Sequence, residues 1–208
     1  RILQTPAIAL AQLIKEMSYM LEVAQRALDK AMDNFINRTE DEEPVRKDLR
    51  EINFLSGKVT DYLIRLSEED MSHNDELTVS SLYKVLSDIM RVADFSNNIM
   101  RYLRVAVANE LYFSSEGLNE IKEMYSLVDE LFKDVDYTFA NRTTRLLAKI
   151  EDTESKTDKF KLQLQQNHLD RLKGGNCKSE SSSLYVNLIG NIERVADHLV
   201  YIAQSVKE

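Results

Sequence analysis

Two carboxylates near the end of the chain are spaced so that a helix would bring them together. Glu193 and Asp197 are four residues apart, so on an α-helix both side chains project from one face, one turn apart. Apolar residues at helical spacing lie beside them: Ile192, Val195, Ala196, Leu199 and Ile202. An acidic pair at the edge of a buried stripe needs a counter-ion, a hydrogen-bonding partner or a metal ion. This pair is therefore the first candidate for a functional site.

The segment that carries this pair occurs twice in the chain. Residues 192–197 read Ile-Glu-Arg-Val-Ala-Asp, and residues 89–94, which lie 103 positions earlier, read Ile-Met-Arg-Val-Ala-Asp. Asp94 is thus the counterpart of Asp197, whereas Met90 stands opposite Glu193. The repeat predicts two similar halves of which only the second has the complete pair.

A second acidic pair with the same spacing, Glu154 and Asp158, precedes the last helix. Its counterpart in the first half is ambiguous by one residue. The two alternatives are Leu49 with Asn53, and Asp48 with Ile52. In either alignment the first half lacks a complete acidic pair. Because 35 acidic residues in 208 produce several such pairs by chance, the spacing alone is a weak motif, and the repeat is what gives it weight.

The composition is typical of a helical globular protein. Of the 208 residues, 43% are hydrophobic and 30% charged, and only five Gly, two Pro and no Trp are present, which favours long helices with few turns. The formal net charge of -8 and the lack of a basic stripe disfavour a nucleic-acid partner. A single cysteine, Cys177, excludes an internal disulfide framework and suits a reducing compartment. No apolar run approaches the roughly 18–20 residues that a membrane-spanning helix needs.

Helical apolar spacing predicts six long helices. The first begins at Thr5-Pro6, where Thr can act as N-cap and Pro occupies the first helical position. The expected helices are about 6–36, 45–66, 74–109, 115 to somewhere past 141, 152–172 and 184–203, with Gly174-Gly175 as a stop signal before the last. Short connections then predict an all-α fold of two antiparallel three-helix bundles in tandem, residues 1–112 and 113–208, related by a pseudo-two-fold axis.

Several kinds of catalytic chemistry are disfavoured. His198 follows Glu193 by five residues rather than three, and no Glu-x-x-His occurs, unlike in ferritin-like di-iron bundles. Gly174-Gly175 follow a helix instead of preceding one, so they do not form a phosphate-cradling loop. His168 lies near the expected end of the fifth helix, where a capping role is favoured. No nucleophile–base pair stands out, and we do not expect an enzyme.

The residues described so far resemble a known family. Residues 191–198, Asn-Ile-Glu-Arg-Val-Ala-Asp-His, are similar to the signature of PhoU-like phosphate-regulatory proteins, whose fold is also a tandem three-helix bundle. Residues 5–10 and 167–177 resemble parts of the C-terminal PhoU-like domain of bacterial sodium/phosphate cotransporters. The resemblance covers essentially the whole chain.

The resemblance to the cotransporters implies a regulatory domain on the cytoplasmic side of the cell membrane. It would modulate phosphate transport by a transporter membrane domain of the same polypeptide, which fits a chain that starts at Arg1 rather than Met. A second copy of the chain is a further candidate partner. The alternative is a free-standing, cytoplasmic PhoU-like adaptor that regulates phosphate signalling through a sensor kinase or an ABC-type phosphate transporter.

The resemblance also implies a metal site, because family members are associated with Glu(Asp)-x-x-x-Asp words in both halves. Here Glu193 and Asp197 would be ligands and Glu154 and Asp158 the adjacent pair. Such a carboxylate set suits a hard divalent or trivalent ion, with iron, zinc and manganese as candidates. We expect this site in the second bundle only.

Three further residues would support the site. Arg194 is expected to orient the carboxylates, and Asp94 is the carboxylate that the first half retains. His198 lies about 100° round the helix from Asp197, so we expect it to form hydrogen bonds at a surface or interface rather than to bind the metal. The alternative to a metal is that the carboxylates pair with Arg194, Arg171 or backbone groups.

Overall fold

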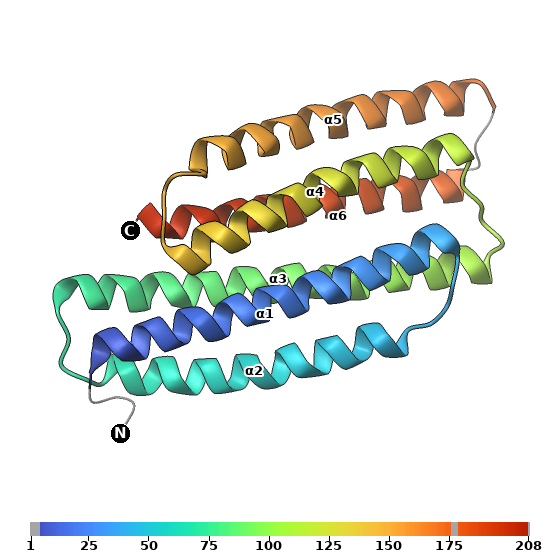
Figure 1. Ribbon diagram of the computed structural model, residues 1–208. Coiled ribbons are helices and arrows are strands. Elements are labelled where there is room, and N and C mark those ends of the chain that lie inside the picture. The colour runs from blue at the N-terminus through green and yellow to red at the C-terminus, as the bar shows by residue number, and fades with distance from the viewer. Residues whose placement is uncertain (1–4, 176–178, 208) are drawn as a thin grey trace.

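Long helices form almost the whole chain. The computed structural model describes residues 5–175 and 179–207. Its helices are α1 (Pro6–Asn37), α2 (Glu43–Ser67), α3 (His73–Ala108), α4 (Ser115–Asn141), α5 (Leu147–Lys173) and α6 (Ser179–Gln204), followed by the short 3-10 helix η2 (Ser205–Lys207) (Figure 1). No strand occurs in these two ranges, and the all-α fold expected from the sequence is confirmed.

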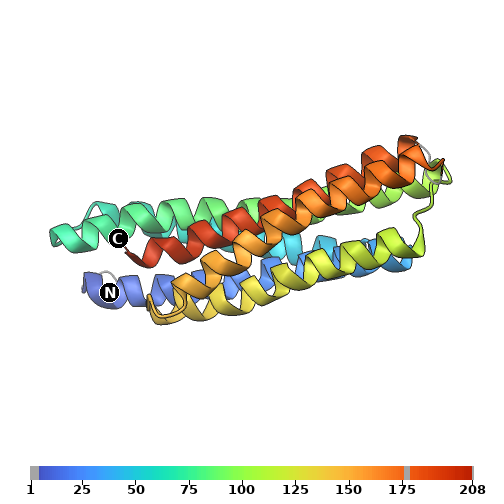
Figure 2. The same cartoon turned by 90° about the horizontal axis from the view of Figure 1, so that it is seen from above.

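The helices pack as two groups of three. Helices α1, α2 and α3 contact one another, as do α4, α5 and α6. The two groups meet through two helix pairs, α3 with α6 and α1 with α4, and Figure 2 shows α6 lying along α3 and α4 along α1. The connection between the groups is the segment 109–114. Helix α6 contacts α3, α4 and α5, so it is central to the second group and to the junction.

Local signals in the sequence account for the helix ends. The Ser72 and Ser114 side chains accept hydrogen bonds from the backbone N–H groups of Asp75 and Gly117, which caps α3 and α4. Thr5 precedes α1 in an extended conformation, but its side chain makes no capping hydrogen bond. Gly175 has a φ of 73°, which Gly adopts without strain and which ends α5.

Two helices begin earlier than the sequence predicted. Helix α5 starts at Leu147 instead of about Asp152, because the side chains of Leu147 and Ile150 are buried and hold its first turn against the core. Helix α6 already includes Ser179, although the polar segment up to Ser183 was expected to lead into it. Cys177 lies outside the described residues. Within 5–175 and 179–207, no helix combines the length and the apolar composition that crossing a membrane requires.

The interface between α1 and α4 is rich in acidic side chains. Tyr125 of α4 donates a hydrogen bond to Asp29 of α1, and Asp129 lies beside Asp29. Burial, followed by the charge of Asp29, raises the pKa of Asp129 to about 6. Further along the same interface, burial raises the pKa of Asp136 to about 7, and the charge of Glu22 adds to the effect. One carboxyl oxygen of Asp136 is buried without a hydrogen-bond partner among the described residues.

This arrangement predicts that stability falls as the pH rises. Between the ordinary Asp pKa of 3.8 and about 7, the folded chain keeps a proton on Asp136 that the unfolded chain releases. Asp136→Asn is therefore expected to raise the free energy of unfolding at pH 8 by about 1–3 kcal/mol, allowing for partial exposure, with a gain that shrinks toward pH 5. Urea unfolding followed by circular dichroism at several pH values measures this. The control Asp61→Asn, at an exposed position of α2, should leave the pH profile unchanged, and an identical shift in both variants would refute the prediction.

Candidate metal site

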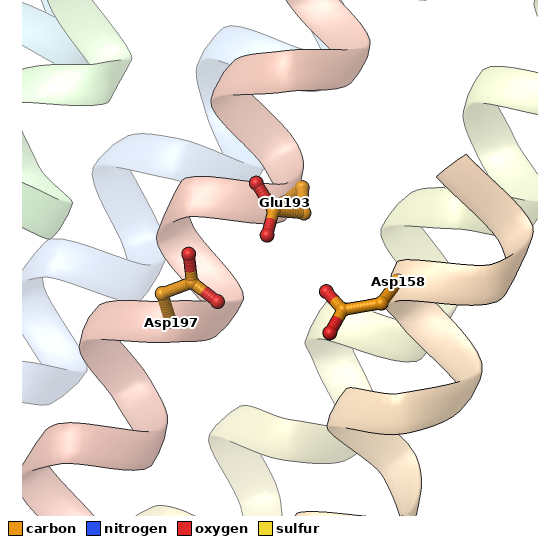
Figure 3. Close-up of side chains that lie close together, drawn as sticks. All are labelled: Asp158, Glu193 and Asp197. Atoms are coloured by element: carbon orange, nitrogen blue, oxygen red, sulfur yellow. The ribbon is translucent and has the colours of Figure 1, made fainter. Parts of the chain in front are cut away.

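Three carboxylates from two helices meet on one side of the second bundle. Figure 3 shows Asp158 of α5 pointing toward Glu193 and Asp197 of α6. One oxygen from each lies within 4.8 Å of the oxygens of the other two. Asp158 is exposed and the other two are half-buried, because they lie at the edge of the apolar stripe of α6. The spacing of four residues on α6 and the packing of α5 against α6 together form the cluster.

Glu154 completes the set of four residues that the sequence singled out. It is half-buried one turn before Asp158 on α5, and its carboxyl group is close enough to that of Asp197 to form a hydrogen bond. It is not among the three residues whose oxygens all lie within 4.8 Å. The structure thus gathers all four predicted side chains, with Asp158, Glu193 and Asp197 as the tightest group.

The cluster carries an excess of negative charge. Burial first, and then the negative charges of neighbouring carboxyl groups, raises the pKa values of Glu154 and Asp158 above their usual range, although a hydrogen bond with Asp197 acts in the opposite direction on Glu154. The pKa of Asp197 is raised as well, by burial first and then by its contacts with Glu154. The ammonium group of Lys161 is 3.5 Å from Glu193. One partly exposed Lys does not neutralise four carboxyl groups, so a bound cation would stabilise this region.

The donor set fits a small hard metal ion. Two oxygens bound to one zinc-sized ion are at most about 4.0–4.4 Å apart, because each metal–oxygen bond is about 2.0–2.2 Å long. Three oxygens within 4.8 Å of one another can therefore reach one ion after small side-chain movements. All the ligand atoms are carboxylate oxygens, which suits hard divalent and trivalent ions.

The supporting role expected for Arg194 is not what the structure shows. Its guanidinium group lies over the ring of Phe95 of α3, 5.4 Å from the ring centroid, and none of the ion pairs in the described ranges involves it. Lys161 is the cation beside the carboxylates, and sequence reasoning missed it. A signal was present, because Lys161 follows Asp158 by three residues and so shares its helix face. Arg171, the other expected partner, pairs with Glu120 instead.

His198 joins the two bundles. Its Nδ1 atom is 2.8 Å from Oδ1 of Asp88 on α3, and both side chains are mostly buried. This is the interface role that its position on the helix predicted. His168 differs from the expectation of a helix cap, since it is buried, lies within hydrogen-bonding distance of Ser182 and stacks on Tyr185.

The burial pattern settles the alignment that the sequence left open. Adding 105 to the numbers of five buried residues of α2 reaches buried residues of α5, whereas adding 106 to any buried residue of α2 reaches none. The matching pairs are Val45/Ile150, Asp48/Thr153, Ile52/Thr157, Val59/Leu164 and Leu63/His168. Leu49 and Asn53 therefore stand opposite Glu154 and Asp158.

The first bundle thus retains one of the four carboxylates. Its counterpart positions hold Leu49, Asn53, Met90 and Asp94. The alternative candidate, Asp48, is buried and forms salt bridges with Arg26 and Lys30 of α1. In the part of the chain that the structure describes, the group of Asp158, Glu193 and Asp197 is the one set of three or more side chains with metal-binding spacing.

Comparisons with known proteins agree with this architecture. Along 99% of its length, the chain is 24% identical to YjbB of Escherichia coli (strain K12), a protein named for inorganic phosphate export, but it spans only 38% of that relative. It is also 24% identical to the phosphate-specific transport system accessory protein PhoU homolog 1 of Thermotoga maritima, covering 95% of this chain and 85% of that protein. The crystal structure of PhoU from Pseudomonas aeruginosa has the same fold, with a TM-score of 0.87, 16% identity and 97% coverage of both chains.

The family model of the PhoU domain matches residues 17–103 and 121–206. The first match lies within α1–α3 and the second within α4–α6 and η2, so each bundle contains one copy. Together the two matches cover most of the chain. This chain therefore belongs to the PhoU domain family.

Proposed function

We propose that the chain is a regulatory adaptor in phosphate signalling that docks on a phosphate transporter or its sensor kinase. The observation that carries this proposal is the PhoU domain match in both bundles. It is supported by the relative in Thermotoga maritima, which is named as an accessory protein of a phosphate-specific transport system and is covered over 85% of its length. In this function the long outer faces of the helices serve as docking surfaces.

A second candidate is a regulatory domain of a longer phosphate transport protein, such as a sodium/phosphate cotransporter. One observation favours it: 99% of this chain aligns with 38% of a protein named for phosphate export. Transport would then take place in the remainder of that longer protein, and this domain would lie on the cytoplasmic side of the cell membrane. The two candidates share the regulatory role and differ in whether the transporter is a separate chain.

Deleting the segment that encodes this chain from its source organism tests both candidates. For an adaptor, a phosphate-responsive reporter should lose its dependence on external phosphate. For a domain of an export protein, labelled phosphate should leave preloaded cells more slowly while the reporter still responds. Re-expression of the intact chain should restore the first phenotype. An unchanged reporter together with unchanged phosphate uptake and efflux would refute a regulatory role in phosphate metabolism.

We further propose that Asp158, Glu193 and Asp197, assisted by Glu154, hold a divalent or trivalent metal ion. The support is the convergence of their oxygens within 4.8 Å and the excess negative charge. Because the ligands come from both α5 and α6, binding would fix these two helices relative to each other. Metal occupancy would then determine the shape of one outer face of the second bundle, which a docking partner could recognise.

A further inference from the structure

A cavity of about 350 Å³ lies at the end of the second bundle. It is bordered by the connection between the two bundles, the start of α4, the end of α5 and the start of α6, at the right-hand end of the molecule in Figure 1. The side chains that matter for its chemistry are Tyr112, Ser114, His168, Arg171, Ser181 and Tyr185. The cavity is separate from the carboxylate cluster, with which it shares no residue.

The floor of this cavity is a buried polar network. The side chain of Arg171 is only 13% exposed, and its Nη1 atom is 2.5 Å from Oε1 of Glu120. Tyr185 and Asn167 also donate hydrogen bonds to Glu120. His168 is 3% exposed and stacks on Tyr185 with a centroid distance of 4.8 Å. Burying such groups costs free energy that apolar side chains of similar volume would not cost.

The repeat shows that the fold does not require this network. With the offsets of 105 for α2/α5 and 103 for α3/α6, the counterparts of His168, Arg171 and Tyr185 in the first bundle are leucines: Leu63, Leu66 and Leu82. All three leucines are fully buried. The first bundle therefore closes the same end with an ordinary apolar core. The second bundle carries a cation, an imidazole and a phenol there, beside an open cavity.

The positive features of the cavity converge on one place. Gly117 lies in the first turn of α4, and Nη2 of Arg171 is 3.8 Å from the position that a Cβ atom would take there. The guanidinium group thus lies beside the N-terminus of α4, which carries a partial positive charge. The hydroxyl groups of Ser114 and Ser181 also line this region. Glu120 is the buried carboxylate that pairs with Arg171, whereas Glu116 in the first turn of α4 is exposed, so its charge is screened by water. The guanidinium group and the N-terminus of α4 together favour an anion.

Two other charged or titratable groups near the cavity, His168 and Glu110, do not oppose the binding of an anion. Burial, and after it the charge of Arg171, lowers the pKa of His168, which favours the neutral form of its ring. Glu110 also borders the cavity but is exposed, so water screens its charge. Tyr112, which is 69% exposed at the rim, provides an aromatic surface next to the anion position.

We propose that this cavity is a binding site for a phosphate group, either inorganic or carried by a small organic molecule. The phosphate oxygens lie between Arg171 and the N-terminus of α4, and the space beyond them holds an organic remainder against Tyr112. This site goes beyond the docking function and does not depend on it, because binding requires only the chain itself.

Titrations of the purified chain followed by NMR test the proposal. Inorganic phosphate, adenosine monophosphate and adenosine are added separately, up to about 10 mM, a concentration that detects weak binding. We expect phosphate or the monophosphate to shift the backbone amide signals of residues 114–117, and adenosine not to. Shifts with both phosphates indicate inorganic phosphate as ligand, and shifts with the monophosphate alone indicate a phosphate ester. No shift with either, or equal shifts with adenosine, would overturn the proposal.

A double variant removes the cation without leaving its partner buried and charged. Arg171→Met combined with Glu120→Gln keeps the packing approximately and is expected to weaken phosphate binding at least tenfold. Arg65→Met, at an exposed position near the end of α2, is the matched control and should bind as the parent does.

Gly117→Ala is the second test, because its methyl group would lie 3.2 Å from Oγ of Ser114 and 3.8 Å from Nη2 of Arg171. It retains all charges and should also weaken binding. Unchanged affinity in either variant, with unchanged helical circular dichroism, contradicts the assignment.

Discussion

Replacing Glu193 and Asp197 together by Ala is expected to lower the affinity for a divalent metal ion by about 100-fold or more. The two substitutions remove two of the three oxygens that lie within 4.8 Å of one another and leave Asp158 without a partner on α6. Loss of even an outer contact of a metal site commonly costs 10–100-fold in affinity. Isothermal titration with Mn²⁺, Zn²⁺ and Fe²⁺, and elemental analysis after dialysis, measure the effect.

The same double variant should fold at least as well as the parent chain without metal. The four carboxyl groups repel one another in the parent chain, and this repulsion adds to burial in raising the pKa values of Glu154, Asp158 and Asp197. Removing two of the four groups relieves the repulsion. A higher melting temperature of the metal-free variant, together with lost metal binding, therefore separates loss of a site from misfolding. Asp94→Ala is the matched control and should leave metal binding unchanged. Asp94 is the first-bundle counterpart of Asp197, but Met90 stands where the second bundle has Glu193. If the parent binds none of the three ions, or the double variant binds them equally well, the metal site does not exist.

The gathering of these carboxylates could be predicted because it depends on helix geometry and on few helices. A spacing of four residues places two side chains on one face of a helix, whatever the helix packs against. The middle and last helices of a three-helix bundle are neighbours, so an acidic pair on each is expected to face the other. The repeat with Met90 in place of Glu193 then indicated which half was complete.

The directions of the long side chains around the site could not be predicted. Arg194 follows Glu193 immediately, but the rotation of α6 turns it toward Phe95 of α3. The nearby cation comes from α5 instead, as Lys161. Both outcomes depend on how far α5 and α6 are rotated about their axes. The sequence leaves the alignment of α5 uncertain by one residue, and one residue corresponds to a rotation of about 100° around a helix. The same ambiguity of one residue separated Leu49 from Asp48 as the counterpart of Glu154, and only burial resolved it.

The cavity network was missed for a different reason. From their positions near the end of α5, the sequence predicts a helix cap for His168 and a partner of the carboxylates for Arg171. Their partners, Glu120 and Tyr185, lie on α4 and α6 and are distant in sequence. One signal was available: at these positions of α5 the first half has Leu63 and Leu66. Such a polar-for-apolar difference between two halves of a repeat shows that the packing of the fold does not require the polar side chains there.

Replacing Leu199 by Ala is expected to lower the free energy of unfolding by about 2–5 kcal/mol, the range for a large buried side chain that leaves a cavity. Leu199 belongs to the apolar stripe beside the acidic pair and is fully buried on α6, the helix that contacts α3, α4 and α5. The whole chain should lose stability in one transition, because α6 contributes to both the second bundle and the junction. Leu162→Ala on α5 is the matched control. Its side chain is 66% exposed, so the same chemical change there should cost no more than about 0.5 kcal/mol. Urea unfolding followed by circular dichroism compares the two, and equal effects would mean that α6 is not packed at the centre as described.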